Sequence, residues 1–150
     1  MTRSPTDEAR PARIDLPGGI QVRVTSRAYP GGLRPFDHDW LHAELIVAAR
    51  DSERGFRCSA FLRAGPFGEF ASACADPEQK TVRFAPNEPY VALELCAGQA
   101  RVIAREVGSA RVVRRSESIA GAARAALADQ FAAGADRFPS RGPIDGSAPS

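Results

Sequence analysis

The residue types best suited to chemistry gather in one stretch, residues 36–44, which holds both histidines, the only tryptophan and three carboxylates. Imidazole and carboxylate groups are what proteins use to bind zinc or to move protons. His38 and His42 are four residues apart, a spacing that brings two side chains together on a helix. On a strand the same side chains lie about 13 Å apart, too far for one ion. The alternating pattern that follows Trp40 predicts a strand and therefore no metal site.

The same residues also have a structural explanation. Asp37 and Asp39 are typical of turns, where their carboxylates bond to nearby backbone N–H groups, and Trp40 is expected to pack on the core. We favour this interpretation over catalysis and predict no cofactor. A small enzyme with its site around His38, Asp39 and His42 is the alternative.

The rest of the sequence lacks the residues of a catalytic site. Its three cysteines, Cys58, Cys74 and Cys96, are odd in number and widely spaced, which predicts neither a disulfide framework nor a CxxC site. Each lies in an apolar pattern and is expected to be buried. Glu88 and Glu94 are expected in a turn and on a solvent face, and no G-x-S-x-G motif marks a serine nucleophile. The sequence thus predicts a non-catalytic protein.

The basic residues do not predict a nucleic-acid partner. The 150 residues carry a net charge of only +2, and 19 of the 20 basic residues are arginine. An arginine patch is expected near residues 101–115, but binding of single strands also needs aromatic stacking platforms, and residues 91–118 contain none. The glycines form neither a P-loop nor a dinucleotide motif. An ordinary charged outer face explains these arginines.

An alternation of apolar and polar residues dominates the sequence, the pattern of strands with one face on a core. It predicts strands at residues 20–24, 41–47 and 56–62, and the polar turn at 51–55 joins the last two as a hairpin. Shorter stretches predict three or four further strands, at residues 81–85, 91–95, 100–107 and 110–115.

Two segments change to a helical period. A short helix is predicted to start at Pro66, since a proline suits the first turn, and to end before Pro77. A second helix is predicted from a cap at Ser118 to about residue 137. Its apolar stripe is narrow but continuous, consisting of Ala123, Leu127, Phe131, Ala135 and Phe138.

Successive hairpins with separate helices indicate an α+β domain. We expect a mainly antiparallel sheet of six to seven strands, with the short middle helix and the C-terminal helix packed on it. Residues 20–138 form the single domain, and residues 1–19 and 139–150 are expected to be flexible tails. No run of about 20 apolar residues predicts a membrane span, and residues 1–13 lack the apolar core of a secretory signal. A cytoplasmic protein is expected.

One set of motifs resembles a known family. Asp-His-Asp-Trp-Leu leads into the long strand at residue 41, Gly-Phe opens the next strand at residue 55, and Phe-Ala-Pro-Asn-Glu-Pro precedes the strand at residue 91. With a phenylalanine-containing helix between them and a helix at the end, this order resembles the WapI-type immunity proteins of bacteria over most of residues 20–138.

The resemblance implies a protein that binds a bacterial toxin domain and blocks it without catalysis. A rigid sheet and its loops would present charge and a few anchoring side chains to the toxin. Residues expected in loops or facing outward are candidates for this contact: Asp37, His38, Asp39, Tyr90, Arg114 and Arg115. A structural domain that associates through an exposed sheet edge is a further alternative, and the oligomeric state stays open.

Overall fold

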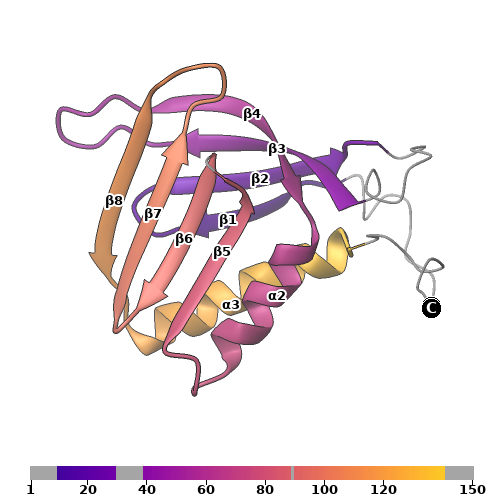
Figure 1. Ribbon diagram of the computed structural model, residues 1–150, viewed down its shortest axis with the longest axis vertical. Helices are drawn as coiled ribbons and strands as arrows, with labels where there is room; N and C mark the ends of the chain where they lie inside the picture. The colour runs from indigo at the N-terminus through magenta and orange to yellow at the C-terminus, as the bar shows by residue number, and fades with distance from the viewer. Residues whose placement is uncertain (1–9, 30–38, 89, 141–150) are drawn as a thin grey trace.

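Eight strands and two helices make up the part of the chain that the computed structural model describes, residues 10–29, 39–88 and 90–140 (Figure 1). The first sheet has the antiparallel order β1-β2-β3-β4 and the second the antiparallel order β5-β6-β7-β8. This confirms the α+β class. The elements are β1 (Ala12–Leu16), β2 (Ile20–Arg27), β3 (Trp40–Val47), β4 (Phe56–Arg63), α2 (Gly65–Ala75), β5 (Thr81–Asn87), β6 (Val91–Cys96), β7 (Gln99–Arg105), β8 (Val112–Ser118) and α3 (Gly121–Arg137).

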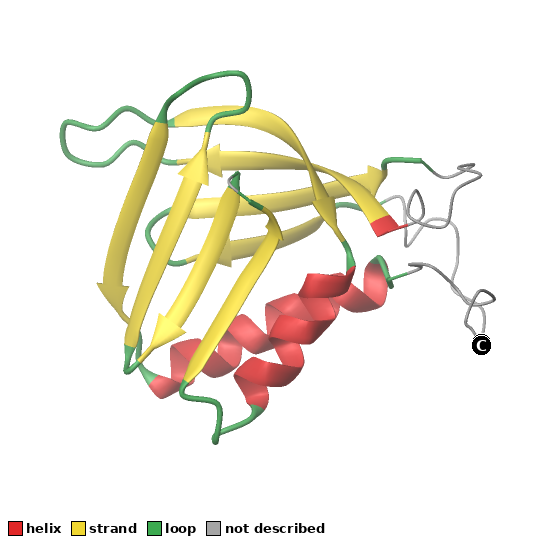
Figure 2. Ribbon diagram, in the orientation of Figure 1, coloured by secondary structure: helices red, strands yellow, loops and turns green. Residues whose placement is uncertain are grey.

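The strands of the two sheets run across each other, and both helices lie side by side at one end of them (Figure 2). The inward side chains of both sheets and the apolar faces of α2 and α3 share one buried core. Because side chains alternate along a strand, every strand that contributes to this core leaves its other face to solvent. The outer faces of the two sheets are therefore the broad surfaces on which polar and exposed apolar side chains are displayed.

Aromatic rings join the helices to the second sheet. Phe67 and Phe70 from α2 meet Phe84 of β5 and Phe131 of α3, with ring centroids 4.4 to 5.9 Å apart. All four side chains are at least 98% buried. Tilted and edge-to-face rings at these distances add to the free energy gained from burying their area. This ring cluster holds α2 and α3 in place.

The first strand lies in a segment that we expected, from the sequence, to be a flexible tail. Residues 12–16 pair with β2 over their whole length, from Ala12 opposite Val24 to Leu16 opposite Ile20. Ala12, Ile14 and Leu16 alternate with Arg13 and Asp15, so the period of two is present but short and flanked by prolines. The expected tail at residues 1–19 is therefore wrong for this strand, and the first sheet has one strand more than expected.

The helices begin close to the expected residues. Proline lies in the first turn of α2, as predicted. In α3 the residue before the first turn is Ala120, which has no capping side chain, and Ser118 instead ends β8 and accepts a hydrogen bond from Gln99. The capping role of Ser118 is therefore wrong, because the strand continues three residues further than expected. Neither helix within the described residues is long and apolar enough to cross a membrane.

The residues that directly follow α3 are held against the rest of the molecule. Phe138 is buried, and the carbonyl oxygen of Pro139 accepts a hydrogen bond of 2.8 Å from Arg27. Residues 141–150 of the expected C-terminal tail, and residues 1–9 of the N-terminal one, lie outside the described residues. The folded unit therefore extends from β1 to about residue 140.

The ring cluster predicts a large loss of stability in Phe131→Ala. Removing a fully buried phenylalanine costs about 3–5 kcal/mol, because apolar area is lost and a cavity is left. Chemical denaturation followed by circular dichroism measures the change in unfolding free energy. Asp129→Ala, an exposed position of the same helix, is the control and is expected to change it by less than about 0.5 kcal/mol. Equal effects of the two substitutions would contradict the packing described.

Candidate functional site

The predicted contact residues do not form one surface. Asp37 and His38 lie outside the described residues. Asp39 directly precedes β3 in the first sheet, whereas Tyr90 follows β5 and Arg114 lies on β8, both in the second sheet. Tyr90 is half-buried and Arg114 is exposed. The described candidates are thus divided between two sheets.

Asp39 is buried, with 5% of its surface exposed. Its carboxylate accepts a hydrogen bond of 2.7 Å from the hydroxyl of Ser140 and lies 3.6 Å from the Arg63 guanidinium. Its carbonyl oxygen accepts from the N–H of Ala64. Asp39 therefore ties the end of β4 and the chain after α3 to the start of β3, a structural role. The expectation that it faces outward is wrong, and so is the packing of Trp40 in the core, because Trp40 is only half-buried.

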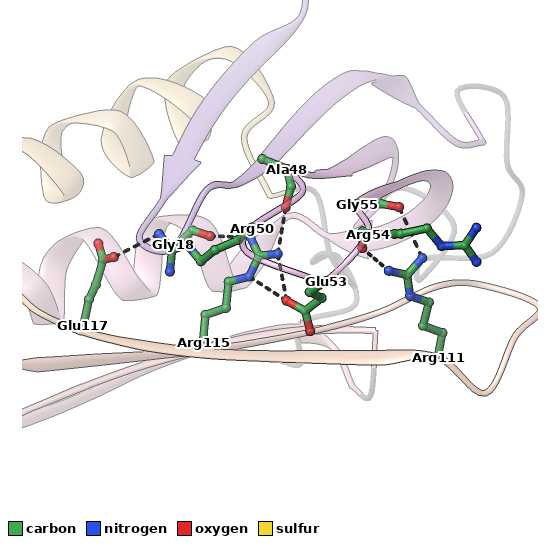
Figure 3. A network of polar contacts seen from close by, with 9 residues as sticks. All are labelled: Gly18, Ala48, Arg50, Glu53, Arg54, Gly55, Arg111, Arg115 and Glu117. Carbon is green, nitrogen blue, oxygen red and sulfur yellow. Dashed lines mark hydrogen bonds and ion pairs between the residues drawn. The ribbon is translucent and has the colours of Figure 1, made fainter.

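Arg115 also faces inward, against the expectation of an outward side chain. Val113 belongs to the core, and the residue two further along a strand must lie on the same face. Its side chain is only 3% exposed, and it joins the two sheets (Figure 3). The guanidinium donates to the carbonyl oxygens of Gly18 at 2.6 Å and Ala48 at 2.7 Å, and to the carboxylate of Glu53 at 2.9 Å.

These acceptors come from two turns of the first sheet. Gly18 lies between β1 and β2, and Ala48 and Glu53 lie between β3 and β4. Gly18 has a positive φ of 84°, and a Cβ built on it would lie 2.9 Å from the Cβ of Arg115. Glycine is therefore required there both by the backbone and by the close approach of Arg115. We call these four residues the Arg115 network.

Two further pairs support this junction. Arg111 donates to the carbonyl oxygens of Arg54 and Gly55 (Figure 3), and its guanidinium lies 5.5 Å from the ring centroid of Phe56. Arg50 and Glu117 form an exposed ion pair of 3.6 Å, which adds little on its own. The turn between β3 and β4 is thus held at both of its ends, by Glu117 of β8 near its start and by Arg111, just before β8, near its end.

Exposed aromatic side chains form a different group, on the outer face of the first sheet. Tyr29 is 46% exposed and Phe61 is 45% exposed, and their rings stack with centroids 6.1 Å apart. His42 pairs with Phe61 across β3 and β4, and its ring centroid lies 5.6 Å from that of Phe61. We call Tyr29, His42 and Phe61 the aromatic cluster. Sequence reasoning missed it, although Phe61 is the one apolar residue in the outward set Arg57, Ser59, Phe61 and Arg63.

The imidazole of His42 is held by Thr25. A β-bulge between Val24 and Ser26 places the Thr25 hydroxyl 3.0 Å from the carbonyl oxygen of His42 and 3.2 Å from its Nδ1. The one hydroxyl thus contacts both the backbone and the ring of His42. The geometry orients the ring rather than activating a nucleophile.

Two arginines on the outer face of β4 are already paired within the chain. Arg57 makes a bidentate pair with Glu44, at 2.7 and 2.8 Å, and this hydrogen bonding lowers the pKa of Glu44 and raises that of Arg57. Arg63 faces Asp39. Among the described residues, the cluster thus offers a ligand aromatic surface, while Arg57 and Arg63 are already paired.

The cysteines supply no reactive centre. Cys74 is buried as expected, and burial raises the pKa of its thiol. Cys58 is partly buried, and Cys96 is exposed, so the expectation of three buried thiols is wrong for Cys96, which ends β6 on its outer face. Within the described ranges, no group of three or more His, Cys, Asp and Glu side chains could hold a metal ion.

Comparisons with protein-family models, with curated proteins and with solved structures found no match to this chain.

The Arg115 network predicts that two neighbouring arginines differ sharply in their contribution to stability. Arg115→Met is expected to lower the unfolding free energy by about 2–3 kcal/mol, because hydrogen bonds to a charged group are lost and two carbonyl groups lose their partner. Arg114→Met, at the exposed neighbouring position, is the control and is expected to change it by less than about 0.5 kcal/mol. Chemical denaturation measures both. A loss no greater in Arg115→Met than in Arg114→Met would contradict the network.

The burial of the thiols predicts their order of reaction with an aromatic disulfide reagent. The thiolate is the reacting form, so the exposed Cys96 should react first in the folded protein. Cys74 should stay unreacted at neutral pH until denaturant is added, because its thiol is buried and its pKa is raised. Mass spectrometry of the labelled chain after digestion identifies the sites. Labelling of Cys74 as fast as Cys96 in the folded state would refute this arrangement.

Proposed function

We propose that this chain is a non-catalytic protein-binding module that docks its partner on the aromatic cluster. The observation that carries the proposal is the stacked pair of Tyr29 and Phe61, each nearly half exposed on the outer face of the first sheet. Aromatic side chains are enriched at protein interfaces, and tryptophan and tyrosine are frequent among the residues that supply most of the binding energy. The cluster thus has the composition of an interface centre.

The surroundings of the cluster support binding rather than catalysis. Thr25 fixes the imidazole of His42, and the nearby arginines are paired with Asp39 and Glu44. Side chains that are fixed before a partner arrives lose little conformational freedom on binding, which favours affinity. No contact joins Asp39 to His42 among the described residues, so the alternative enzyme site around His38, Asp39 and His42 gains no support from the part that is described.

The second part of the proposal concerns the identity of the partner. The motifs at residues 37–41, 55–56 and 84–89 resemble those of WapI-type immunity proteins, and a module that works by occlusion needs only a binding surface. On this proposal the partner is the toxin domain of a bacterial protein, and the chain protects the cell that makes both by covering that domain.

The proposal predicts that a neighbouring reading frame encodes a long secreted protein that ends in a toxin domain. Co-expression with that domain tests both levels of the proposal. The wild-type chain should restore growth, and Phe61→Ala should weaken binding about thirtyfold, the effect of losing an interface hot spot of about 2 kcal/mol. Ser59→Ala, on the same face of β4, is the matched control and should bind like the wild type. Calorimetry measures the affinities.

Two outcomes would contradict the proposal in different ways. Failure of the wild-type chain to bind or to protect would refute the toxin partner. Equal affinities of Phe61→Ala and Ser59→Ala for a partner that does bind would refute the aromatic cluster as the docking surface.

A further inference from the structure

A hollow of about 490 Å³ lies on the outer face of the second sheet. Strand register explains where it lies: Ala92 pairs with Ile103, which pairs with Arg114, and Arg105 pairs with Val112. The small side chain of Ala92 leaves space beside larger neighbours. We call this feature the arginine hollow; its lining residues are Glu88, Ala92, Ile103, Arg105, Val112 and Arg114.

The floor of the arginine hollow is apolar although it lies on a solvent face. Ile103 is 37% exposed, and Ala92 and Val112 are partly exposed around it. Strand positions that face water are usually polar, so an isoleucine beside an alanine and a valine forms a local apolar patch. A ligand that fits here must cover hydrocarbon as well as meet charge.

The charges of the arginine hollow are not balanced within the chain. Arg114 is exposed, and its guanidinium makes no hydrogen bond or ion pair with any residue that the structure describes. Nε of Arg105 donates to the carbonyl oxygen of Ser109, and no carboxylate in the described ranges pairs with this arginine. The one acid of the lining, Glu88, is already bonded to Arg83. Two guanidinium groups are therefore available to an anion.

The spacing of the two arginines selects the form of that anion. Arg105 and Arg114 are diagonal neighbours across β7 and β8, a relation that separates side chains by about 7–8 Å. Residues i and i+2 of an extended peptide lie about 6.6 Å apart and face the same side. Two carboxylates at such positions match the two guanidinium groups, each of which can hold a carboxylate through a planar pair of N–H donors.

We propose that the arginine hollow binds an extended acidic segment of a protein partner with glutamates at positions i and i+2. One carboxylate pairs with Arg105 and the other with Arg114, and the methylene groups of the two glutamates cover Ile103. This surface lies on a different sheet from the aromatic cluster and does not depend on the function proposed for that cluster.

Titration of the isotope-labelled full chain with a synthetic peptide, followed by two-dimensional NMR, tests this proposal. The probe is blocked Ser-Glu-Ser-Glu-Ser, and its control has glutamine in place of glutamate. The glutamate peptide should shift the amide signals of Ile103, Arg105 and Val112 to saturation, and the glutamine peptide should not. Sodium glutarate and oligothymidine, tested alone, should both bind more weakly than the glutamate peptide.

Two exposed arginines of the second sheet give a matched pair of variants. Arg114→Gln should weaken the glutamate peptide about tenfold, since a charge-assisted pair is lost. Arg101→Gln, on the same outer face but outside the lining, should change the affinity by less than about twofold. Arg105→Gln provides a second variant of the hollow and should weaken binding as Arg114→Gln does.

The proposal is overturned by any of four results: no saturable shift with the glutamate peptide, equal binding of the glutamine peptide, equal loss in Arg114→Gln and Arg101→Gln, or tighter binding of glutarate or oligothymidine. Because the aromatic cluster is unchanged in these variants, failure here would leave the function proposed for that cluster standing, and loss of toxin binding in Phe61→Ala would leave the hollow unaffected.

Discussion

The arrangement of the two sheets depends on one buried cation. Arg115 lies on the inward face of β8, where an uncompensated charge would be strongly unfavourable. Backbone carbonyl oxygens from the turn before β2 and the turn after β3, together with the Glu53 carboxylate, compensate it. Each of these groups is on the first sheet. The charge therefore cannot be satisfied unless the two sheets meet at this junction, which is also where Gly18 makes room for the arginine.

Because Arg115 must face inward, it also determines which residues of β8 face solvent. With Val113 and Arg115 inward, Arg114 must face solvent, where it lines the arginine hollow beside Ile103. On the first sheet the bulge in β2 places Thr25 against His42, and Tyr29 and Phe61 are exposed. Both outer faces thus rest on a core that the sheets share, which fixes the backbone beneath them before any ligand binds. Such rigidity suits a protein that works by binding.

The sequence predicts the strands well because alternation reports burial directly, as in the hairpin of β3 and β4. Sequence-based prediction fails for a strand that is short and for a buried residue that is charged. Residues 12–16 alternate, but the strand is short and lies between prolines, so it was assigned to a tail. Arg115 is expected to face outward because the alternation at residues 110–115 leaves the register ambiguous, and its acceptors lie about 60 to 100 residues away along the chain. The aromatic cluster brings together residues from three segments, which only strand pairing can reveal.

Hydrogen exchange in Arg115→Met tests most directly whether this side chain holds the sheets together. The amides of Ala48, Arg50 and Glu53 are bonded within the first sheet and its turn, and none of them touches β8 through its own hydrogen bond. If Arg115 locks the junction, these amides should exchange faster together with those of β8, while Val22 and Leu45 in the centre of the first sheet keep their protection. Faster exchange confined to β8, or no change in the turn, would show that the sheets are held together without this arginine.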